Sequence, residues 1–459
     1  MAGEWAIATI EEVSEKVAMG PFGSSIKVET FVPNGIPVIS GQHLHGHRLD
    51  DTPGFNFITP EHAERLRNAN VQRGDVIFTH AGNIGQVAYI PESSQYDRYV
   101  ISQRQFYMRP NRSRVIPELV TYYFKSTQGR HRLLANASQV GVPSLAQPVT
   151  YLRTIEMPVP PLGEQRAITH ILGTLDDKIE LNRRMNETLE AMARAIFKSW
   201  FVDFDPVHAK AEGRDPCLPD EIADLFPKHL RDFELGEIPK GWRVGVLNDL
   251  TEVLLGGDWG ADKPTADETE AVFCIRGADI PNLQGAGLGK MPVRYLKPSS
   301  LAKRRLKDGD LAIEVSGGSP TQSTGRPVLV SQALLNRLDH PLVCSNFCRV
   351  VKLKYRPASS FVYLWLRELY DNDKFLQYEN GTTGIKNFAL SLFSEKFQLV
   401  IPPTDLLEAF AFRIATILER QQCLGAEAGT LAALRNTLLP KLISGELHID
   451  QVEAFLASR

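Results

Sequence analysis

The stretch PVPP at residues 158–161 opens a long helical pattern, and VIPP at residues 400–403 opens a second pattern of the same kind. The apolar positions of the first pattern recur in the second without a gap: Ile168, Leu172, Leu175, Leu189 and Ile196 correspond to Phe410, Ile414, Ile417, Leu431 and Leu438. Upstream, the chain repeats shorter pieces, such as Ile39-Ser40-Gly41 and Ile275-Arg276-Gly277. A duplication this long predicts two copies of one unit, a globular domain followed by a helix, related by a pseudo-two-fold axis. That symmetry suits a two-fold ligand such as duplex DNA.

Length and composition indicate a cytoplasmic protein of several domains. At 459 residues the chain is too long for one hydrophobic core. No apolar run reaches the roughly 18 residues that a membrane span needs, and Met1 to Ile10 lacks the pattern of a signal peptide. The five cysteines form an odd set without CxxC spacing, which favours reduced thiols. A net charge of −3 provides no global attraction for nucleic acid, so local patches or a partner would have to supply it.

The sequence predicts an α+β fold, in which two similar strand-rich domains are joined by two long antiparallel helices that form a coiled coil. The expected boundaries are 1–157 for the first domain, 158–200 for the first helix, 201–237 for an ordered connector, 238–399 for the second domain, 400–439 for the second helix and 440–459 for a tail. Within the first domain, Pro117 to Leu134 is expected to form one helix, because Pro is favoured at a helix start and the apolar residues share one face.

Both long helices carry the heptad pattern that is typical of a coiled coil. In the first helix the a positions hold Leu172, Ile179, Asn186, Ala193 and Trp200, and the d positions hold Ile168, Leu175, Asn182, Leu189 and Ile196. Asn182 and Asn186 lie near the middle of the first pattern and Gln421 near the middle of the second. Antiparallel pairing would bring these polar residues together, where they would fix the register. The alternative is that each helix packs on its own globular domain.

The sequence lacks the motifs of enzymes that act on DNA. An adenine methyltransferase would need an Asn/Asp-Pro-Pro-aromatic loop, whereas the Pro-Pro pairs here are followed by Leu162 and Thr404. A metal nuclease would need clustered carboxylates with a nearby lysine, but the segment from Asp310 to Glu314 lacks the lysine. No Walker loop is present either. His43, His45 and His47 alternate in one loop, which is compatible with a metal site or with solvated or DNA-facing side chains.

Polar loops at matching places in the two copies remain as candidates for DNA contact. Arginine reads guanine, asparagine and glutamine read adenine, and serine and threonine read either base. The candidates in the first copy are Gln42, His43, His45, Arg48, His80, Asn83, Gln103, Arg104, Gln139 and Ser144. Those in the second copy are Arg276, Asp279, Ser316, Ser319, Thr321, Gln322, Arg326, Asn346, Thr382, Lys386 and Asn387. Solvation explains any one of them, but the matched placement favours DNA contact for the set.

Several motifs resemble those of the specificity subunits of type I restriction-modification systems. They are MGPFGSS at 19–25, PVPPLGEQR at 158–166, LDDKI at 175–179, IPKGW at 238–242 and TLLPKLISGEL at 437–447, and they extend over nearly the whole chain. The resemblance implies two target-recognition domains, each reading one half of a split DNA sequence. It also implies a chain without an active site or cofactor of its own, which docks two modification subunits that bind S-adenosylmethionine and methylate adenine. Through them it would engage restriction subunits that use ATP and magnesium to translocate DNA.

On this resemblance, the helical seam and its ends are the expected dock for the modification subunits. The residues are Leu162, Glu164, Ile168, Phe197, Trp200, Leu439, Leu442 and Ile443. The second copy departs from the family pattern at Thr404-Asp405, so its helix cap and partner contact are expected to differ. Two other classes of function stay open: a metal-dependent DNA-processing enzyme that uses the histidine loop, and a scaffold that binds only proteins.

Overall fold

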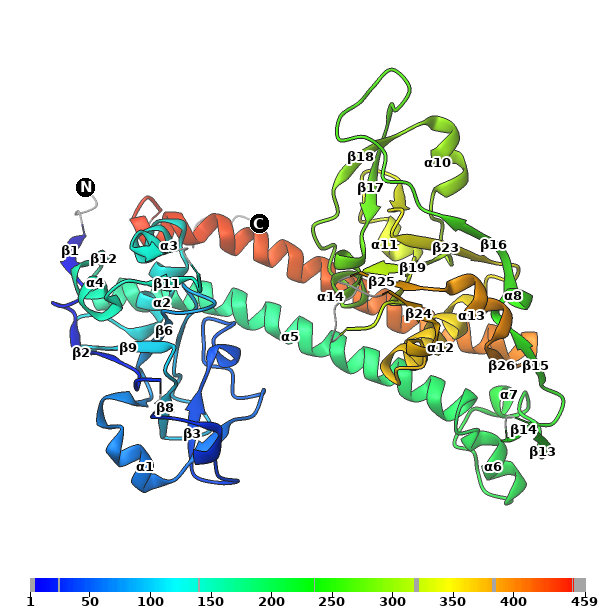
Figure 1. Ribbon diagram of the computed structural model, residues 1–459, viewed down its shortest axis with the longest axis horizontal. Coiled ribbons are helices and arrows are strands. Elements are labelled where there is room, and N and C mark those ends of the chain that lie inside the picture. The colour runs from blue at the N-terminus through cyan, green and yellow to red at the C-terminus, as the bar shows by residue number, and fades with distance from the viewer. Residues whose placement is uncertain are drawn as a thin grey trace. The chain divides into compact units, whose positions relative to one another are not determined.

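The computed structural model describes residues 5–23, 25–138, 141–234, 236–317, 322–381, 385–447 and 449. The chain divides into two compact units, of which the first comprises Met1–Asp177 with Leu431–Arg459 and the second comprises Lys178–Thr430. Each unit contains one strand-rich domain and segments of both long helices (Figure 1). The expected α+β class is therefore confirmed. No helix in the described ranges is long and apolar enough to cross a membrane.

The first strand-rich domain is built on two four-stranded sheets. One has the order β2-β9-β6-β7, formed by Ser14–Met19, Gln105–Pro110, Val76–Thr79 and Val87–Tyr89. The other has the order β4-β3-β8-β5, formed by Asn56–Ile58, Ile36–Ile39, Arg98–Ile101 and Asn70–Gln72. Two small pairs accompany them: β1 (Ala6–Thr9) with β12 (Glu156–Val159), and β10 (Ala137–Ser138) with β11 (Ser144–Leu145).

The second strand-rich domain repeats this topology. Its sheet β16-β23-β19-β21 consists of Thr251–Gly256, Cys348–Leu353, Leu311–Glu314 and Pro327–Leu329, and β18-β17-β22 consists of Val293–Leu296, Glu270–Ile275 and Leu342–Cys344. The small sheets are β15 (Arg243–Val246) with β26 (Gln398–Ile401), and β20-β25-β24 (Ser316–Gly317, Lys386–Phe388 and Glu379–Asn380). In both domains one pair is parallel, β3 with β8 and β17 with β22. The duplication thus extends to strand order and direction.

Both domains carry short helices and 3-10 turns between their strands. The first has α1 (Pro60–Arg65), α2 (Pro117–Lys125), α3 (Thr127–Leu134) and α4 (Pro148–Thr154), with 3-10 turns η1 (Val28–Thr30), η2 (Gly41–His43) and η3 (Arg67–Ala69). The second has α8 (Leu247–Leu250), α9 (Ile280–Gln284), α10 (Pro298–Arg304), α11 (Gln332–Leu335), α12 (Ala358–Asp371) and α13 (Leu390–Lys396), with η4 (Gly277–Asp279) and η5 (Leu376–Tyr378).

The helix expected from Pro117 to Leu134 is two helices. Ser126 has an extended backbone, with φ −66° and ψ 158°, and its hydroxyl accepts the Gly129 N–H at 3.2 Å. Serine favours this capping role because its side chain replaces a missing backbone partner at a helix start. The prediction of one continuous helix was therefore wrong at Ser126.

The segment between the first long helix and the second domain is ordered, as expected. It forms α6 (Asp205–Ala211), α7 (Asp220–Ala223) and the hairpin of β13 (Leu230–Phe233) with β14 (Gly236–Pro239). The hairpin continues past the predicted domain boundary at residue 237, because β14 ends at Pro239.

The long helices α5 (Leu162–Phe201) and α14 (Thr404–Ser444) lie side by side and run antiparallel within each unit (Figure 1). In the second unit the Gln421 side chain donates to the Asn186 carbonyl oxygen at 3.1 Å, and Asn182 donates to Glu427 at 3.0 Å. In the first unit Arg435 of α14 pairs with Asp176 of α5. The expected meeting of the central polar residues is confirmed. The helices nevertheless also pack on the domains, so the two alternatives for the helices both hold in part.

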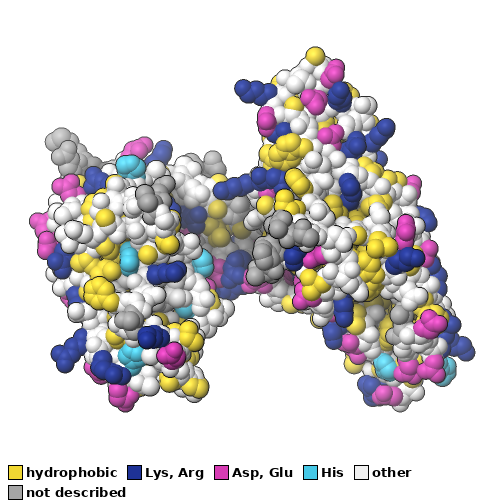
Figure 2. Space-filling model, viewed as in Figure 1, with side chains coloured by type: hydrophobic (Ala, Val, Ile, Leu, Met, Phe, Trp, Pro, Cys, Tyr) yellow, Lys and Arg dark blue, Asp and Glu magenta, His cyan; other side chains and the backbone are white. Residues whose placement is uncertain are grey.

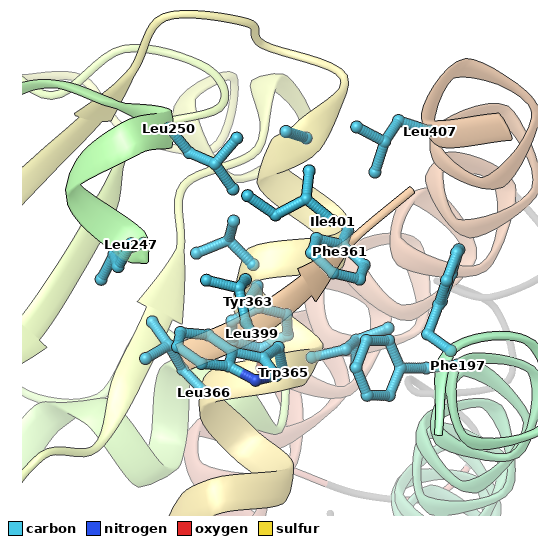
Figure 3. Packing of buried hydrophobic residues seen from close by; sticks show 14 of the residues in the cluster. Phe197, Leu247, Leu250, Phe361, Tyr363, Trp365, Leu366, Leu399, Ile401 and Leu407 are labelled. Atoms are coloured by element: carbon cyan, nitrogen blue, oxygen red, sulfur yellow. The ribbon is translucent and has the colours of Figure 1, made fainter. Parts of the chain in front are cut away.

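Each unit has an apolar core that joins its domain to both helices. In the first unit the core includes Leu119 and Tyr123 of α2, Leu172 of α5 and Leu442 of α14. In the second unit the ring of Phe197 from α5 lies 5.8 Å from that of Phe361 from α12, and Figure 3 shows Leu407 of α14 beside them. The helices are thus integral parts of the two domain cores.

Candidate nucleic-acid interface

Four loops of the first domain meet at one edge of its sheets. We call the segments 20–23, 79–83, 102–105 and 142–145 the first rim. They are tied by backbone hydrogen bonds from the N–H of His80 to Arg104 O (2.9 Å), of Gly82 to Pro143 O (2.9 Å), of Leu145 to His80 O (2.8 Å) and of Gly20 to Gln105 O (2.9 Å). This edge holds its loops by main-chain bonds, so the exposed side chains can differ without loss of the framework.

The second domain repeats the same framework. We call the segments 257–260, 314–317, 345–348 and 385–388 the second rim. Its bonds run from the N–H of Val315 to Phe347 O (2.9 Å), of Phe388 to Val315 O (2.8 Å) and of Gly257 to Cys348 O (3.2 Å). Ser316 pairs with Asn387 in this rim as Ala81 pairs with Ser144 in the first. The repeat therefore includes the candidate DNA-contacting loops as well as the sheets.

A polar pair lies beneath each rim, at corresponding positions. In the first domain the Thr79 hydroxyl donates to the Gln86 side-chain oxygen at 3.2 Å, and Gln86 donates to the Gly41 carbonyl oxygen at 3.0 Å. In the second domain the Arg326 guanidinium donates twice to the Glu314 carboxylate, both times at 2.8 Å. The glycine that corresponds to Gly41 is Gly277, where a Cβ would lie 2.2 Å from the Glu314 carboxylate. The glycine is required because the polar pair fills the space of a side chain.

Several of the sequence candidates are exposed on or near the rims. In the first domain Asn83, Gln103 and Arg104 are exposed on the rim, and Ser144 and His80 are half-buried. The Nε2 atom of His80 lies 3.1 Å from the Gln103 carbonyl oxygen. In the second domain Asn346 and Asn387 are exposed, and Ser316 and Lys386 are half-buried. Gln42, His45 and Gln322 are exposed as well. Gln139, Ser319, Thr321 and Thr382 lie outside the described residues.

Other candidates have internal partners that occupy their polar groups. His43 is only 1% exposed, and its Nδ1 accepts the Ser40 N–H at 2.9 Å. The Asp279 carboxylate accepts the backbone N–H of Arg276 at 3.1 Å and the guanidinium of Arg276 at 2.8 Å. His43 and Asp279 occupy the same position of a 3-10 turn in the two copies, η2 and η4. In both turns this side chain accepts the backbone N–H of the residue that precedes the turn. We therefore correct their assignment, because a buried cap has no free atom for a base edge. Arg326 is reassigned because its side chain is only 12% exposed and directs two of its guanidinium nitrogens to Glu314.

A buried ionic cluster joins the first domain to both helices. The Asp176 carboxylate accepts the Tyr122 hydroxyl at 2.9 Å, lies 3.3 Å from Nδ1 of His47 and pairs with Arg435. Burial lowers the pKa of His47 to about 4, against the opposing attraction of Asp176. Burial likewise lowers the pKa of Lys125 to about 8. This cluster holds the domain on the helix pair.

Arg48 extends this cluster. It donates to the Tyr89 hydroxyl at 3.0 Å and to Asp177 at 2.6 Å, so it is committed to the junction rather than to DNA. His43 stacks on Phe55 with ring centroids 4.3 Å apart, whereas His47 lies at Asp176, so the histidines do not converge on one point. No group of metal-binding side chains occurs among the described residues.

Most of the residues expected to dock a partner are buried in the chain's own cores. Ile168, Leu439, Leu442 and Ile443 belong to the core of the first unit, and Phe197 and Trp200 to that of the second. We correct their assignment, because side chains in these cores offer a partner no surface. Leu162 and Glu164 are half-exposed, and Glu164 accepts the Trp5 indole N–H at 3.1 Å.

An apolar groove lies on the outer face of the helix pair in the second unit. It is lined by Met192, Ile196, Ile222, Ala409, Phe412, Arg413, Thr416 and Ile417. Phe412 is 79% exposed. The duplication places Ala167, His170, Ile171, Thr174, Leu434 and Leu438 at the corresponding positions in the first unit, and all six are half-buried or exposed. Sequence periodicity marked Ile196 and Ile417 only as seam positions, and it missed Met192 and Phe412 because they lie outside the a and d positions.

The visible surface carries mixed charge. Lysine and arginine side chains are interspersed with acidic ones over both domains, including the lobe of β18 and α10 (Figure 2). Two aromatic side chains on the rims were also missed by the sequence analysis, Phe22 and Phe347, because only hydrogen-bonding residues were considered. They are 86% and 51% exposed.

Comparison with known proteins identifies relatives of this chain. The family described as "Type I restriction modification DNA specificity domain" matches residues 2–191. The HindI specificity subunit of Haemophilus influenzae is 24% identical over 429 residues, covering 82% of this chain and 87% of that protein. The MjaIX specificity subunit of Methanocaldococcus jannaschii is 24% identical over 454 residues, covering 98% and 95%.

A solved structure shares the fold. The S subunit of the type I restriction-modification system of M. genitalium matches with a TM-score of 0.53 and 14% identity, covering 96% of this chain and 97% of that one. At this identity the likeness concerns the fold alone.

Proposed function

We propose that this chain is a type I restriction-modification specificity subunit, as its similarity to such subunits supports, and that it reads a bipartite DNA sequence, one half-site with each strand-rich domain. The observation that carries the proposal is the pair of rims. The two domains keep the same main-chain framework but expose different side chains, Asn83, Gln103 and Arg104 on one and Asn346 and Asn387 on the other. Two readers of unlike half-sites need this combination, because base contacts specify sequence and the framework only positions them.

In this proposal the chain performs no chemistry. Methylation of adenine belongs to modification subunits that bind S-adenosylmethionine, and cleavage belongs to restriction subunits that use ATP and magnesium. The chain supplies recognition and spacing, and the long helices set the separation of the half-sites. With a net charge of −3 it makes few phosphate contacts by itself, so much of the affinity comes from the basic surface of its partners.

The docking site in this proposal is the groove on the helix pair. An exposed Phe412 beside Met192 and Ile417 fits an apolar partner helix, since such a surface is otherwise costly to leave in water. The corresponding face of the first unit repeats the position with a different composition, His170 in place of Phe412. Two related faces support two modification subunits per chain.

The test is reconstitution with the cognate modification subunits, followed by mapping of methylated adenines on genomic DNA by long-read sequencing. The expected result is one split motif with a fixed spacer. A matched pair of variants, Gln103→Ala in the first rim and Asn346→Ala in the second, should relax the first and second half-site respectively. Methylation without sequence preference, or methylation or cleavage by this chain alone, would refute the proposal.

A further inference from the structure

Each rim exposes one phenylalanine beside its candidate base-reading residues. Phe22 in the first rim is 86% exposed and Phe347 in the second is 51% exposed. A large aromatic side chain gains about 1.5–3 kcal/mol when it is buried, so exposure on an ordered loop calls for a partner that covers it.

The loop of Phe22 is fixed at its start. The Gly20 N–H donates to the Gln105 carbonyl oxygen at 2.9 Å, and a Cβ on Gly20 would lie 2.3 Å from the Ser102 carbonyl oxygen. Only glycine permits this approach. The Ser25 N–H then donates to the Phe22 carbonyl oxygen at 2.8 Å, which closes a tight turn with Phe22 at its outer end. The backbone therefore holds Phe22 away from the core.

The neighbours of this loop favour a nucleic acid as the partner. A Cβ on Gly23 would lie 3.2 Å from the Gln103 side-chain oxygen, and Arg104 follows directly. No ion pair of Arg104 is present among the described residues. The rim of Phe22 thus also carries an amide and an arginine that has no ion pair in the described part of the chain, and this combination matches the way proteins stack on bases while they contact base edges and phosphates.

The second copy reaches the same result from a different loop. The position that corresponds to Phe22 holds Trp259, but the Arg294 guanidinium covers its ring at 4.3 Å from the centroid. The position that corresponds to Arg104 holds Phe347, which is exposed in its place. Thus each rim presents one free aromatic ring, although the loop that supplies it has changed.

We propose that Phe22 and Phe347 stack on bases of the first and second half-site, each opening a base step of the DNA that its domain reads. The inference rests on the proposed function. Insertion of an apolar wedge partly unstacks a step and bends the duplex, so these residues would add specificity through the deformability of the DNA at positions that no polar side chain contacts.

The experiment uses the chain assembled with its modification subunits and a duplex that carries its methylation motif. Phe22→Ala should weaken binding roughly 5- to 150-fold, the range of one lost base–aromatic contact. Phe22→Leu should be intermediate and Phe22→Trp close to the parent. Phe347→Ala is the matched variant for the other half-site. The slope of log Kd against log salt should stay unchanged for these variants, since no phosphate contact is lost, whereas Arg104→Ala is expected to reduce it.

A second readout separates stacking from a purely structural role. 2-Aminopurine placed in turn at each position of the first half-site should brighten at one step with the parent protein and not with Phe22→Ala. If Phe22→Ala binds as tightly as the parent, or lowers the salt slope as Arg104→Ala does, the stacking inference is wrong while the proposed function stands. If the parent assembly shows no preference for a split motif, the proposed function itself fails.

Discussion

Replacement of Arg326 by alanine should mainly destabilise the second domain. Any effect on DNA recognition should follow from this loss of stability. The Glu314 side chain is 3% exposed and receives two hydrogen bonds from Arg326, each 2.8 Å long. Without Arg326 the carboxylate is left charged in a protein interior, a loss that typically costs 3–5 kcal/mol.

The assay is thermal unfolding, with hydrogen exchange of β19 and β23 to assign the transition to the second domain. A loss of roughly 3–5 kcal/mol corresponds to a fall in Tm of about 6–20 °C for a domain of this size. The double variant Glu314→Gln with Arg326→Ala removes the stranded charge and should recover part of the stability.

Arg104→Ala is the control for surface arginines. Arg104 is exposed, so its removal should change stability by less than about 0.5 kcal/mol while DNA binding weakens. If Arg326→Ala unfolds at the parent temperature yet loses DNA discrimination, Arg326 contacts DNA directly, and the reasoning from the buried pair is refuted.

Four further outcomes follow from the structure. His47 has a pKa near 4 in the fold against 6.5 in the unfolded state, so the unfolded state gains a proton first as pH falls. Roughly 3 kcal/mol of the folding stability present above pH 6.5 is therefore lost towards pH 4, and His47→Gln should flatten the dependence of the free energy of unfolding on pH in this range. Lys125, with a pKa near 8 in the fold, affects this dependence only at higher pH. Phe412→Asp should abolish capture of the modification subunit in size-exclusion chromatography without a change in Tm, whereas Trp200→Asp should unfold the second unit; normal assembly of Phe412→Asp would exclude the groove as the dock. Insertion of one heptad into each long helix adds about 10 Å and should lengthen the spacer of the methylated motif by about three base pairs, and an unchanged spacer would contradict the proposed ruler. Exchange of residues 1–157 for a related domain should alter only the first half-site, provided that the incoming domain supplies a tyrosine and an arginine at the positions of Tyr122 and Arg48; a change in both half-sites would exclude independent readers.

The helices were predictable because their information is local. A period of seven residues marks the seam, and the polar residues Asn186 and Gln421 interrupt both patterns near their centres, where the structure joins them at 3.1 Å. The pairing of Arg326 with Glu314 could not be read in this way, because it depends on which strands become neighbours. A polar loop residue and a buried ion-pair partner look the same in one sequence, which is why Arg326, His43 and Asp279 were assigned to DNA.

The two copies differ where each domain meets the helices. The first domain is held through Asp176 of α5, which accepts the Tyr122 hydroxyl. The second is held through Glu190, also of α5, which accepts Arg367 at 2.6 Å. Strict duplication would place the second acid on α14, yet the residue there that corresponds to Asp176 is Leu418, a partly buried member of the second core. When a domain is exchanged, Asp176 keeps its ion pair with Arg435 of α14, and Glu190 keeps its ion pair with Arg194 of α5. The exchange removes the hydrogen bond from Tyr122 or the ion pair from Arg367, which attach the domain to α5. The unit of recognition that can be exchanged is therefore a domain together with the side chains that contact Asp176 or Glu190, because a domain without them loses part of its attachment to the helix.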